Sequence, residues 1–470
     1  MSTGARVVGV SLLVLVLGGG AYGTADAYDV VPGVVTLAPV PPDPEPFPAV
    51  PGVAEPPAVA PALGPLDAAA PVPDAAQVAA LVQGLVTDGR IGPAVGVVVA
   101  DQITGEVLAS HASDQPRVPA STAKLVTGVA ALAALDPAST LDTRVVRGEG
   151  DEIVLVGGGD MMLAPAEGDA DAVVGHAGLG DLATQVAGVL ASTGTTSVRL
   201  GYDGSLFSGP ALSPTWKPAD VNQGFVAPVT SFAVDIAKIR PGEYPPRHAD
   251  PEANAAQVLA QRLAENGITV TGVGPVGPAP AGAEQLGLVR SAPLSDVVHY
   301  FLDTSDNTIT EVVARLVAVD SGLPGSFDGA SQAVLREVAQ LGVDTAGAQL
   351  VDASGLGTGS QLTPDLLLGL LRLVTDPARP ELREIATGMP VAGLTGTLAE
   401  RYTTTSARGL VRAKTGSLPG VTSLAGTVVD ADGRQLLFAV LADQTPGGGQ
   451  PAPRAAIDGF VARLAECGCR

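Results

Sequence analysis

A serine and a lysine three residues apart are the residues of this chain best suited to nucleophilic catalysis. Ser121 and Lys124 stand at the start of a predicted helix over residues 121–135, which is otherwise mostly apolar. One helical turn separates them, so both side chains project to the same face. A serine hydroxyl is a weak nucleophile without an adjoining base, and a lysine becomes that base when burial or a nearby positive charge destabilises its ammonium. The pair predicts an activated serine, unless Ser121 is simply the N-cap of an ordinary helix.

A second polar cluster, Ser305, Asp306 and Asn307, lies at the junction of two predicted helices. Serine, aspartate and asparagine are good helix caps, and capping alone would explain this triplet. The functional interpretation makes Ser305 a proton relay and gives Asn307 the task of holding a substrate amide and Lys124. Asp306 would then brace the loop.

A third polar cluster follows a predicted strand over residues 409–414 and consists of Lys414, Thr415, Gly416 and Ser417. A lysine and a threonine at a strand end can bind a substrate carboxylate, and a glycine lets the substrate backbone approach the strand closely. The backbone N–H groups of Ser121 and Ser417 could form an oxyanion hole. The alternative is a surface strand that runs into a turn. Three such motifs in this order favour catalysis, because each structural explanation would have to hold independently.

Composition excludes several other functions. The formal net charge of −22 over 470 residues argues against nucleic acid, whose phosphates would be repelled. The four histidines are far apart and form no zinc motif, so we expect no metal and no cofactor. No Gly-Lys-Ser/Thr follows the glycine run 157–159, which excludes a phosphate-binding loop. Cys467 and Cys469 are the only cysteines, and a bridge between residues two apart would be strained, so we assign them no chemistry.

The N-terminal residues 1–27 predict a signal peptide or a retained membrane anchor. Arg6 precedes an apolar run over 7–17, and the small residues at 25–27 suit a cleavage site. Either alternative places the bulk of the protein outside the cytoplasm. Residues 28–74 are rich in proline and alanine and are predicted to be a linker.

The folded part begins with a predicted helix over 75–86. Predicted strands occur near both ends of the chain, namely over 94–100, 106–110, 421–429 and 435–441, and a closing helix is expected over 457–466. Strands at both ends suggest one sheet whose sequence is interrupted. We therefore predict a discontinuous main domain, 75–146 with 250–470, and an inserted domain over 147–249.

From about Ala75 to the C-terminus the chain resembles the class C low-molecular-mass penicillin-binding proteins, which are D-alanyl-D-alanine carboxypeptidase/endopeptidases. Besides the three motifs, the resemblance extends over residues 157–160, 203–210, 213–216, 352–356 and 389–398. One departure concerns Gly357 and Thr358, where the family normally has Ser-Arg, and it puts the local support of the site in question.

The resemblance implies an α/β (α+β) fold, a transpeptidase/β-lactamase-like domain with a central antiparallel sheet flanked by helices, plus an inserted mainly β domain. It implies Ser121 as nucleophile and Lys124 as base. Ser305, Asn307 and Lys414 would complete the relay, and Thr415 and Ser417 would receive a terminal carboxylate. The substrate would be a peptidoglycan stem peptide ending in D-Ala-D-Ala, with β-lactam antibiotics as inhibitors. The protein would contact a membrane only through the possible N-terminal anchor.

Two other functions are compatible with the motifs. A β-lactamase of the same fold would hydrolyse penicillin rapidly, but compact β-lactamases are not expected to carry so long an insertion. A non-catalytic cell-wall scaffold protein would not need the three motifs intact.

Overall fold

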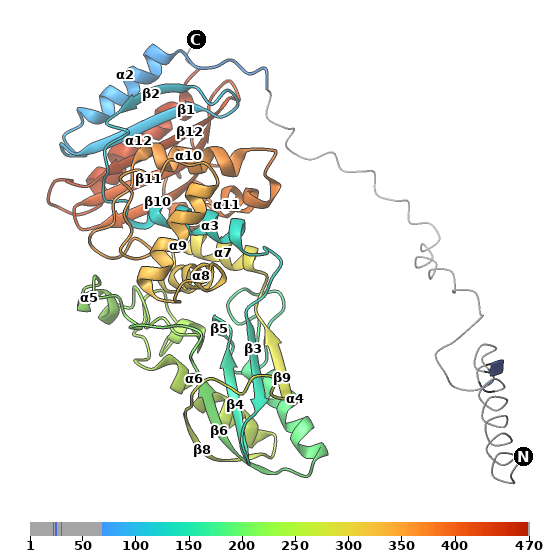
Figure 1. Ribbon diagram of the computed structural model, residues 1–470. Helices are drawn as coiled ribbons and strands as arrows, with labels where there is room; N and C mark the ends of the chain where they lie inside the picture. Colours follow the sequence, from blue (N-terminus) through green and yellow to red (C-terminus); the bar gives the residue numbers. More distant parts are fainter. Residues whose placement is uncertain (1–21, 23, 26–29, 31–67, 469–470) are drawn as a thin grey trace, which may run out of the picture. The chain divides into compact units, whose positions relative to one another are not determined.

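The computed structural model describes residues 22, 24, 25, 30 and 68–468 (Figure 1). The chain divides into two units, Met1–Pro65 and Leu66–Arg470. The predicted apolar segment of residues 1–27, most of the predicted linker and Cys469 lie outside the described residues. Within the described residues, no helix combines the length and apolar character needed to cross a membrane. The second unit contains the sheets described below.

The main sheet has five antiparallel strands in the order β10-β11-β12-β1-β2. They are β1 (Val95–Asp101), β2 (Val107–His111), β10 (Val411–Leu418), β11 (Val421–Val429) and β12 (Gln435–Ala442). Val98 pairs with Ala439, so the first strand of the unit lies beside its last. The prediction that both ends of the chain share one sheet is confirmed.

Helices cover both faces of this sheet, which explains why β12 is apolar along its length. Leu436, Phe438 and Val440 share a core with α2 (Ala75–Val86) and α12 (Pro451–Glu466). Leu437, Ala439 and Leu441 alternate with them and lie in the core of the other face. That core is built by α3 (Lys124–Ala134), α7 (Leu294–Thr304), α8 (Asn307–Asp320), α9 (Phe327–Gln340), α10 (Pro364–Thr375) and α11 (Arg383–Gly388).

A second five-stranded sheet has the order β8-β6-β4-β3-β9. Its strands are β3 (Asp142–Arg147), β4 (Glu152–Gly157), β6 (Ser197–Asp203), β8 (Thr269–Pro275) and β9 (Gln285–Arg290). Strand β6 runs parallel to β4 and β8, and β3 runs antiparallel to β4 and β9. Helices α4 (Leu179–Ser192) and α6 (Pro251–Glu265) share its core. A parallel pair, β5 (Asp160–Leu163) with β7 (Phe232–Val234), and the short α5 (Pro218–Asn222) complete this region.

Strands β8 and β9 lie in residues that the sequence analysis placed in the main domain, yet they pair in the second sheet. Local sequence patterning carries no information on which sheet a strand joins. The pairing of β6 with β8 is a long-range contact across α6, and tertiary packing decided it.

Three local predictions need correction. Lys414 to Ser417 lie inside β10 and do not end a strand. Ser121 lies in a 3₁₀ turn, η1 (Ala120–Ala123), and Ala123 is the N-cap of α3, so Ser121 does not cap that helix. Cys467 is disulfide-bonded, although the two-residue spacing had argued against a bridge.

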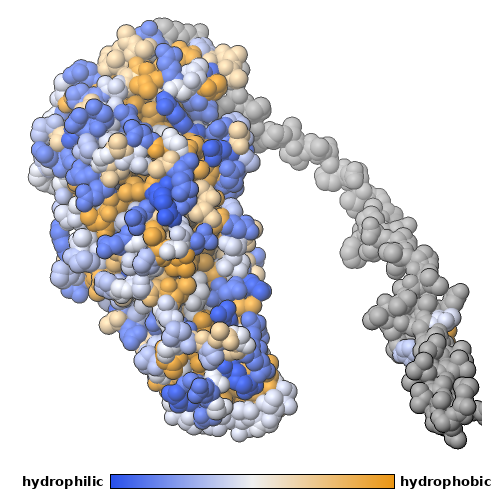
Figure 2. Space-filling model, in the orientation of Figure 1, coloured by the Kyte–Doolittle hydropathy of each residue, from blue (hydrophilic) through white to orange (hydrophobic). Residues whose placement is uncertain are grey.

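The surface view mixes hydrophilic and hydrophobic residues across the visible face (Figure 2). Exposed large apolar residues are scattered singly along the sequence, for example Ile103, Leu212 and Leu394. Single exposed apolar residues are common on protein surfaces and do not by themselves mark a binding site.

Candidate active site

The first two motifs meet at the Lys124 amine. Its Nζ lies 3.0 Å from Ser121 Oγ, 2.7 Å from Asn307 Oδ1 and 2.9 Å from the carbonyl oxygen of Ser354. Lys124 is the first residue of α3 and is fully buried. The lysine is therefore held at the serine by one side-chain amide and one backbone carbonyl.

This arrangement suits a neutral amine that accepts a proton. The Asn307 and Ser354 oxygens are acceptors only, so they engage two N–H groups of Lys124. A neutral amine has two N–H groups and one lone pair, which leaves the lone pair for the Ser121 hydroxyl. Burial lowers the pKa of Lys124 to about 8, against the opposing charges of Asp352, Glu311 and Asp306. The geometry can thus activate Ser121 near neutral pH.

Lys414 and Ser305 form the second pair. Lys414 Nζ donates to Ser305 Oγ at 2.9 Å and to the backbone carbonyl of Thr415 at 3.2 Å. Burial, and then the charge of Lys124, hold the pKa of Lys414 well below its usual range. Ser305 closes α7 in the left-handed region at φ +62°, a conformation that non-glycine residues rarely adopt. The structure therefore brings the second and third motifs together.

Strand β10 lies directly against the turn that carries Ser121, and Gly416 permits this approach. A Cβ at residue 416 would lie 2.0 Å from Ser423 Oγ, 2.7 Å from the Pro119 carbonyl and 3.1 Å from the Ser121 nitrogen. Ser423 Oγ also donates to the Pro119 carbonyl at 2.7 Å. The segment that comes close to Gly416 here is the protein's own nucleophile turn, whereas the sequence analysis expected a substrate backbone there.

Asp306, which the sequence analysis expected to brace the loop, lies at the start of α8. Its Oδ1 accepts from the Ile309 backbone at 2.8 Å as the N-cap of α8, so the capping interpretation also holds for this residue. Asn307 Nδ2 donates to the carbonyl of Phe225 at 2.9 Å, which links the site to the region between β3 and β9. On β10, Thr415 Oγ1 lies 2.8 Å from Thr397 Oγ1.

Two buried carboxyl groups, which the sequence analysis did not single out, support the site from behind Lys124. Glu311 accepts from the backbone nitrogens of Ala353 and Ser354, at 3.1 and 2.8 Å, and so aims the Ser354 carbonyl at Lys124. Asp352 accepts from the Trp216 indole at 2.7 Å. Burial raises the pKa of both carboxyl groups. The spacing of Glu311 four residues after Asn307, one helical turn, is the signal that could have revealed it.

The departure at Gly357 is accommodated locally. Its backbone nitrogen donates to Asp352 Oδ2 at 2.6 Å, and a Cβ there would lie 2.2 Å from Thr215 Oγ1. A serine would not fit this position without displacing Thr215. The segment is therefore held by Asp352 in this chain.

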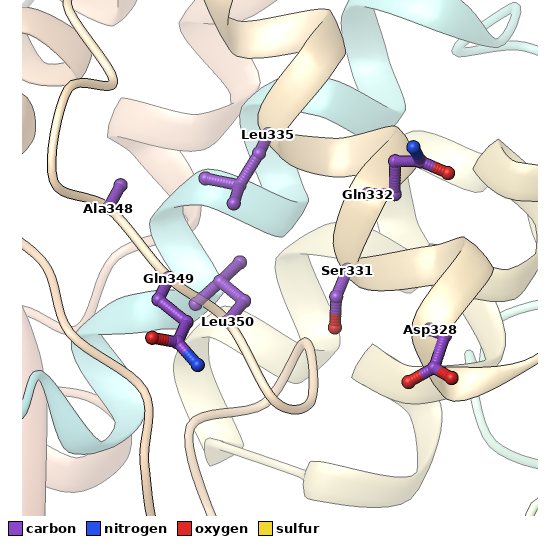
Figure 3. Close-up of a pocket in the computed structure, with 7 residues that line it drawn as sticks. All are labelled: Asp328, Ser331, Gln332, Leu335, Ala348, Gln349 and Leu350. Carbon is purple, nitrogen blue, oxygen red and sulfur yellow. The ribbon is translucent and has the colours of Figure 1, made fainter.

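A shallow pocket of about 280 Å³ lies elsewhere, between α9 and residues 348–350 (Figure 3). Its lining residues include none of the three motifs. Among the residues that the structure describes, no cluster of histidine, cysteine and acidic side chains could hold a metal ion.

The sequence matches known proteins over most of its length. A profile of the D-Ala-D-Ala carboxypeptidase 3 (S13) family matches residues 78–245 and 243–466. The chain belongs to this family. A carboxypeptidase of Mycobacterium tuberculosis is 37% identical over 423 residues, 88% of this chain and 89% of the relative. Carboxypeptidase DacB of Mycolicibacterium smegmatis is 36% identical over 438 residues, 92% of this chain and 90% of the relative.

A solved structure has the same fold. Penicillin-binding protein 4 of Haemophilus influenzae aligns with a TM-score of 0.68 at 22% identity, over 83% of this chain and 99% of that protein. That protein has also been solved in complex with a β-lactam. The S13 member described here is a serine-type D-Ala-D-Ala carboxypeptidase, and the predicted fold class is confirmed.

Proposed function

We propose that Ser121 of this S13 member attacks the carbonyl carbon between the two D-alanines of a peptidoglycan stem peptide. The neutral Lys124 amine takes the Ser121 proton as the C–O bond forms. The backbone N–H groups of Ser121 and Ser417 stabilise the oxyanion. When the C–N bond breaks, the proton passes to the leaving D-alanine nitrogen through Ser305, which Lys414 holds. Water then hydrolyses the acyl-enzyme and regenerates the serine.

One observation supports this assignment most directly. The Lys124 amine lies 3.0 Å from Ser121 Oγ, while its N–H groups donate to the Asn307 side-chain oxygen and the Ser354 carbonyl oxygen. The same attack on the strained amide of a β-lactam opens the ring. The amine leaving group stays covalently attached to the acyl group and therefore cannot leave the site. β-Lactams are therefore proposed as inhibitors. When the amine of a second stem peptide is the leaving group, the same steps describe an endopeptidase.

The test is mass spectrometry of the intact protein after incubation with penicillin. We expect a stable adduct of one drug mass, located on the peptide that contains Ser121. Ser121→Ala should abolish the adduct, and Ser192→Ala, at the exposed end of α4, should keep it. An adduct on another residue would contradict the assignment. Rapid turnover of penicillin without an adduct would favour a β-lactamase instead.

We also propose that the enzyme acts outside the cytoplasm, in the cell envelope or secreted. The charged residue, apolar run and small residues within positions 1–27 support export. N-terminal sequencing of the mature protein tests this. A cleaved product beginning near residue 28 would indicate a signal peptide, an intact terminus in the membrane fraction would indicate an anchor, and a cytoplasmic protein would contradict export.

A further inference from the structure

A cationic side chain from the C-terminal helix reaches β10 beside the third motif. Arg454 lies in the first turn of α12, and its Nη2 donates to Ser417 Oγ at 3.0 Å. The Arg454 side chain is exposed, whereas Ser417 is half-buried. A guanidinium is therefore placed next to the last hydroxyl of the Lys414–Ser417 motif.

The charge of Arg454 has no carboxylate partner within the part of the chain that the structure describes. Asp458 lies one helical turn further along α12, but it pairs with Arg401. Its carboxylate accepts from Arg401 Nε at 3.1 Å and also from Arg401 Nη2. A planar guanidinium binds carboxylates through two parallel N–H groups. Arg454 is thus free to bind an anionic group of a ligand.

The hydroxyls beside Arg454 suit the same ligand group. Thr415 and Ser417 are two residues apart on β10, so their side chains project to the same side, about 7 Å apart along the strand. Their free N–H and C=O edge belongs to β10, the terminal strand of the sheet. A carboxylate placed between these two hydroxyls would lie within reach of the guanidinium.

An aromatic pair lies within electrostatic range of Arg454. The rings of Phe225 and Tyr244 pack edge-to-face at a centroid distance of 5.1 Å, and the Phe225 carbonyl holds Asn307. Burial raises the pKa of Tyr244 to about 12, and the charge of Arg454 acts against that rise. Phe225 thus links Asn307 to Tyr244, on whose hydroxyl the charge of Arg454 acts.

We propose that Arg454 is a specificity-determining residue that binds the terminal carboxylate of the substrate together with Thr415 and Ser417. This inference rests on the proposed function. Arg454 would favour peptides that end in a free carboxylate over peptides blocked at that position. It would contribute to substrate binding and leave the chemistry at Ser121 to Lys124.

The test compares two peptides that end in D-Ala-D-Ala, one with a free C-terminal carboxylate and one with a C-terminal amide. We expect Arg454→Gln to lower kcat/KM for the free carboxylate by about 10- to 100-fold, mostly through KM, because a charge-assisted hydrogen bond is lost. The amide peptide should change less than about twofold. Arg454→Lys should restore part of the loss, since a lysine keeps the charge but not the planar fork.

Arg463→Gln is the matched control, because Arg463 is exposed on the same helix nine residues further on. It should leave both peptides unchanged. A third peptide, amidated at the C-terminus but with an acidic side chain before D-Ala-D-Ala, tests the other possible carboxylate. An Arg454→Gln effect confined to this third peptide would overturn the inference.

Failure of the inference is distinguishable from failure of the proposed function. If the unmodified enzyme cleaves the free peptide and Arg454→Gln cleaves it equally well, only the inference is wrong. If the unmodified enzyme neither cleaves the peptide nor acylates at Ser121, the proposed function is wrong, and the inference falls with it.

Discussion

Lys124 is surrounded by hydrogen-bond acceptors, and no described carboxylate forms an ion pair with it. The carboxyl groups of Asp352 and Glu311 act on it electrostatically but use their oxygens for backbone and indole N–H groups. Burial therefore outweighs the opposing charges and lowers the pKa of the lysine. At the scale of a single residue, the activity of Ser121 depends on this balance.

Replacing Lys124 with alanine should nearly abolish acylation by penicillin. We expect the acylation rate to fall by about 10²- to 10⁴-fold, the usual contribution of a positioned general base. The fold should persist, because the substitution removes a buried amine and leaves the packing of α3 in place. Stopped-flow or gel-based labelling measures the rate, and thermal unfolding checks the fold. The exposed Lys217→Ala variant is the control, and acylation of Lys124→Ala at the rate of the unmodified enzyme would contradict this role.

Acylation should depend on pH through the same lysine. Only the neutral amine accepts the serine proton, so the rate should rise with pH and level off above about 8, the pKa of Lys124. A profile that is flat between pH 6 and 9 would speak against Lys124 as the base.

The lysine pKa also predicts a trend in stability. The unfolded lysine titrates near 10.5 and the folded one near 8, so between these values the unfolded chain binds more protons. The free energy of unfolding must then increase as pH rises through this window, and Lys414 acts in the same direction. Lys124→Met should weaken the trend, which urea denaturation at several pH values would measure.

At the scale of elements, the site depends on the contact between β10 and the η1 turn. This contact places the backbone of Ser417 near that of Ser121 and is possible only without a side chain at residue 416. The strand and the turn are far apart in the sequence. Their distance is therefore set by packing, and small errors there would move the oxyanion hole.

Gly416→Ala should displace β10 from the turn. The added methyl group would overlap Ser423 Oγ and the Pro119 carbonyl, so we expect a loss of about 1–3 kcal/mol in stability from overpacking, together with slower acylation. Thermal unfolding and penicillin labelling report the two effects. Gly459→Ala is the control, since nothing lies within 4 Å of the added methyl group in helix α12. If Gly416→Ala matched this control in both measurements, the close contact would not matter.

At the scale of the whole molecule, the unit Leu66–Arg470 carries the two five-stranded sheets and every residue of the proposed mechanism. Its first described residues contribute to its core. Arg434 pairs with the buried Asp101 and donates to the carbonyls of Ala68 and Ala70, at 3.0 and 3.1 Å. These bonds tie the start of the unit to the main sheet.

A protein of residues 66–470 should therefore fold and be acylated by penicillin as well as the full chain. A shorter version that starts at Ala75 should be less stable, because two acceptors of the buried Arg434 are lost. Calorimetry and penicillin labelling of the three proteins test this. Equal stability of the two truncated proteins would show that the Arg434 contacts contribute nothing.

The sequence alone was sufficient for the features that depend on short spacing. Helix α2 begins and ends at the predicted residues, and so does β11. The pairing of Ser121 with Lys124 follows from one helical turn. The family and the fold class followed from the three motifs, because residue types and the order of motifs can be read directly from the sequence.

Tertiary structure decided whatever depends on long-range contact. It brought Ser354 and Glu311 behind Lys124, assigned β8 and β9 to the second sheet, and placed Arg454 beside Ser417. No local pattern contains these contacts, because hydrogen bonds between distant segments are selected by the packing of the whole core. The residue types at the site could be identified from the sequence. The distances between these residues depend on tertiary packing, and their pKa shifts depend on burial.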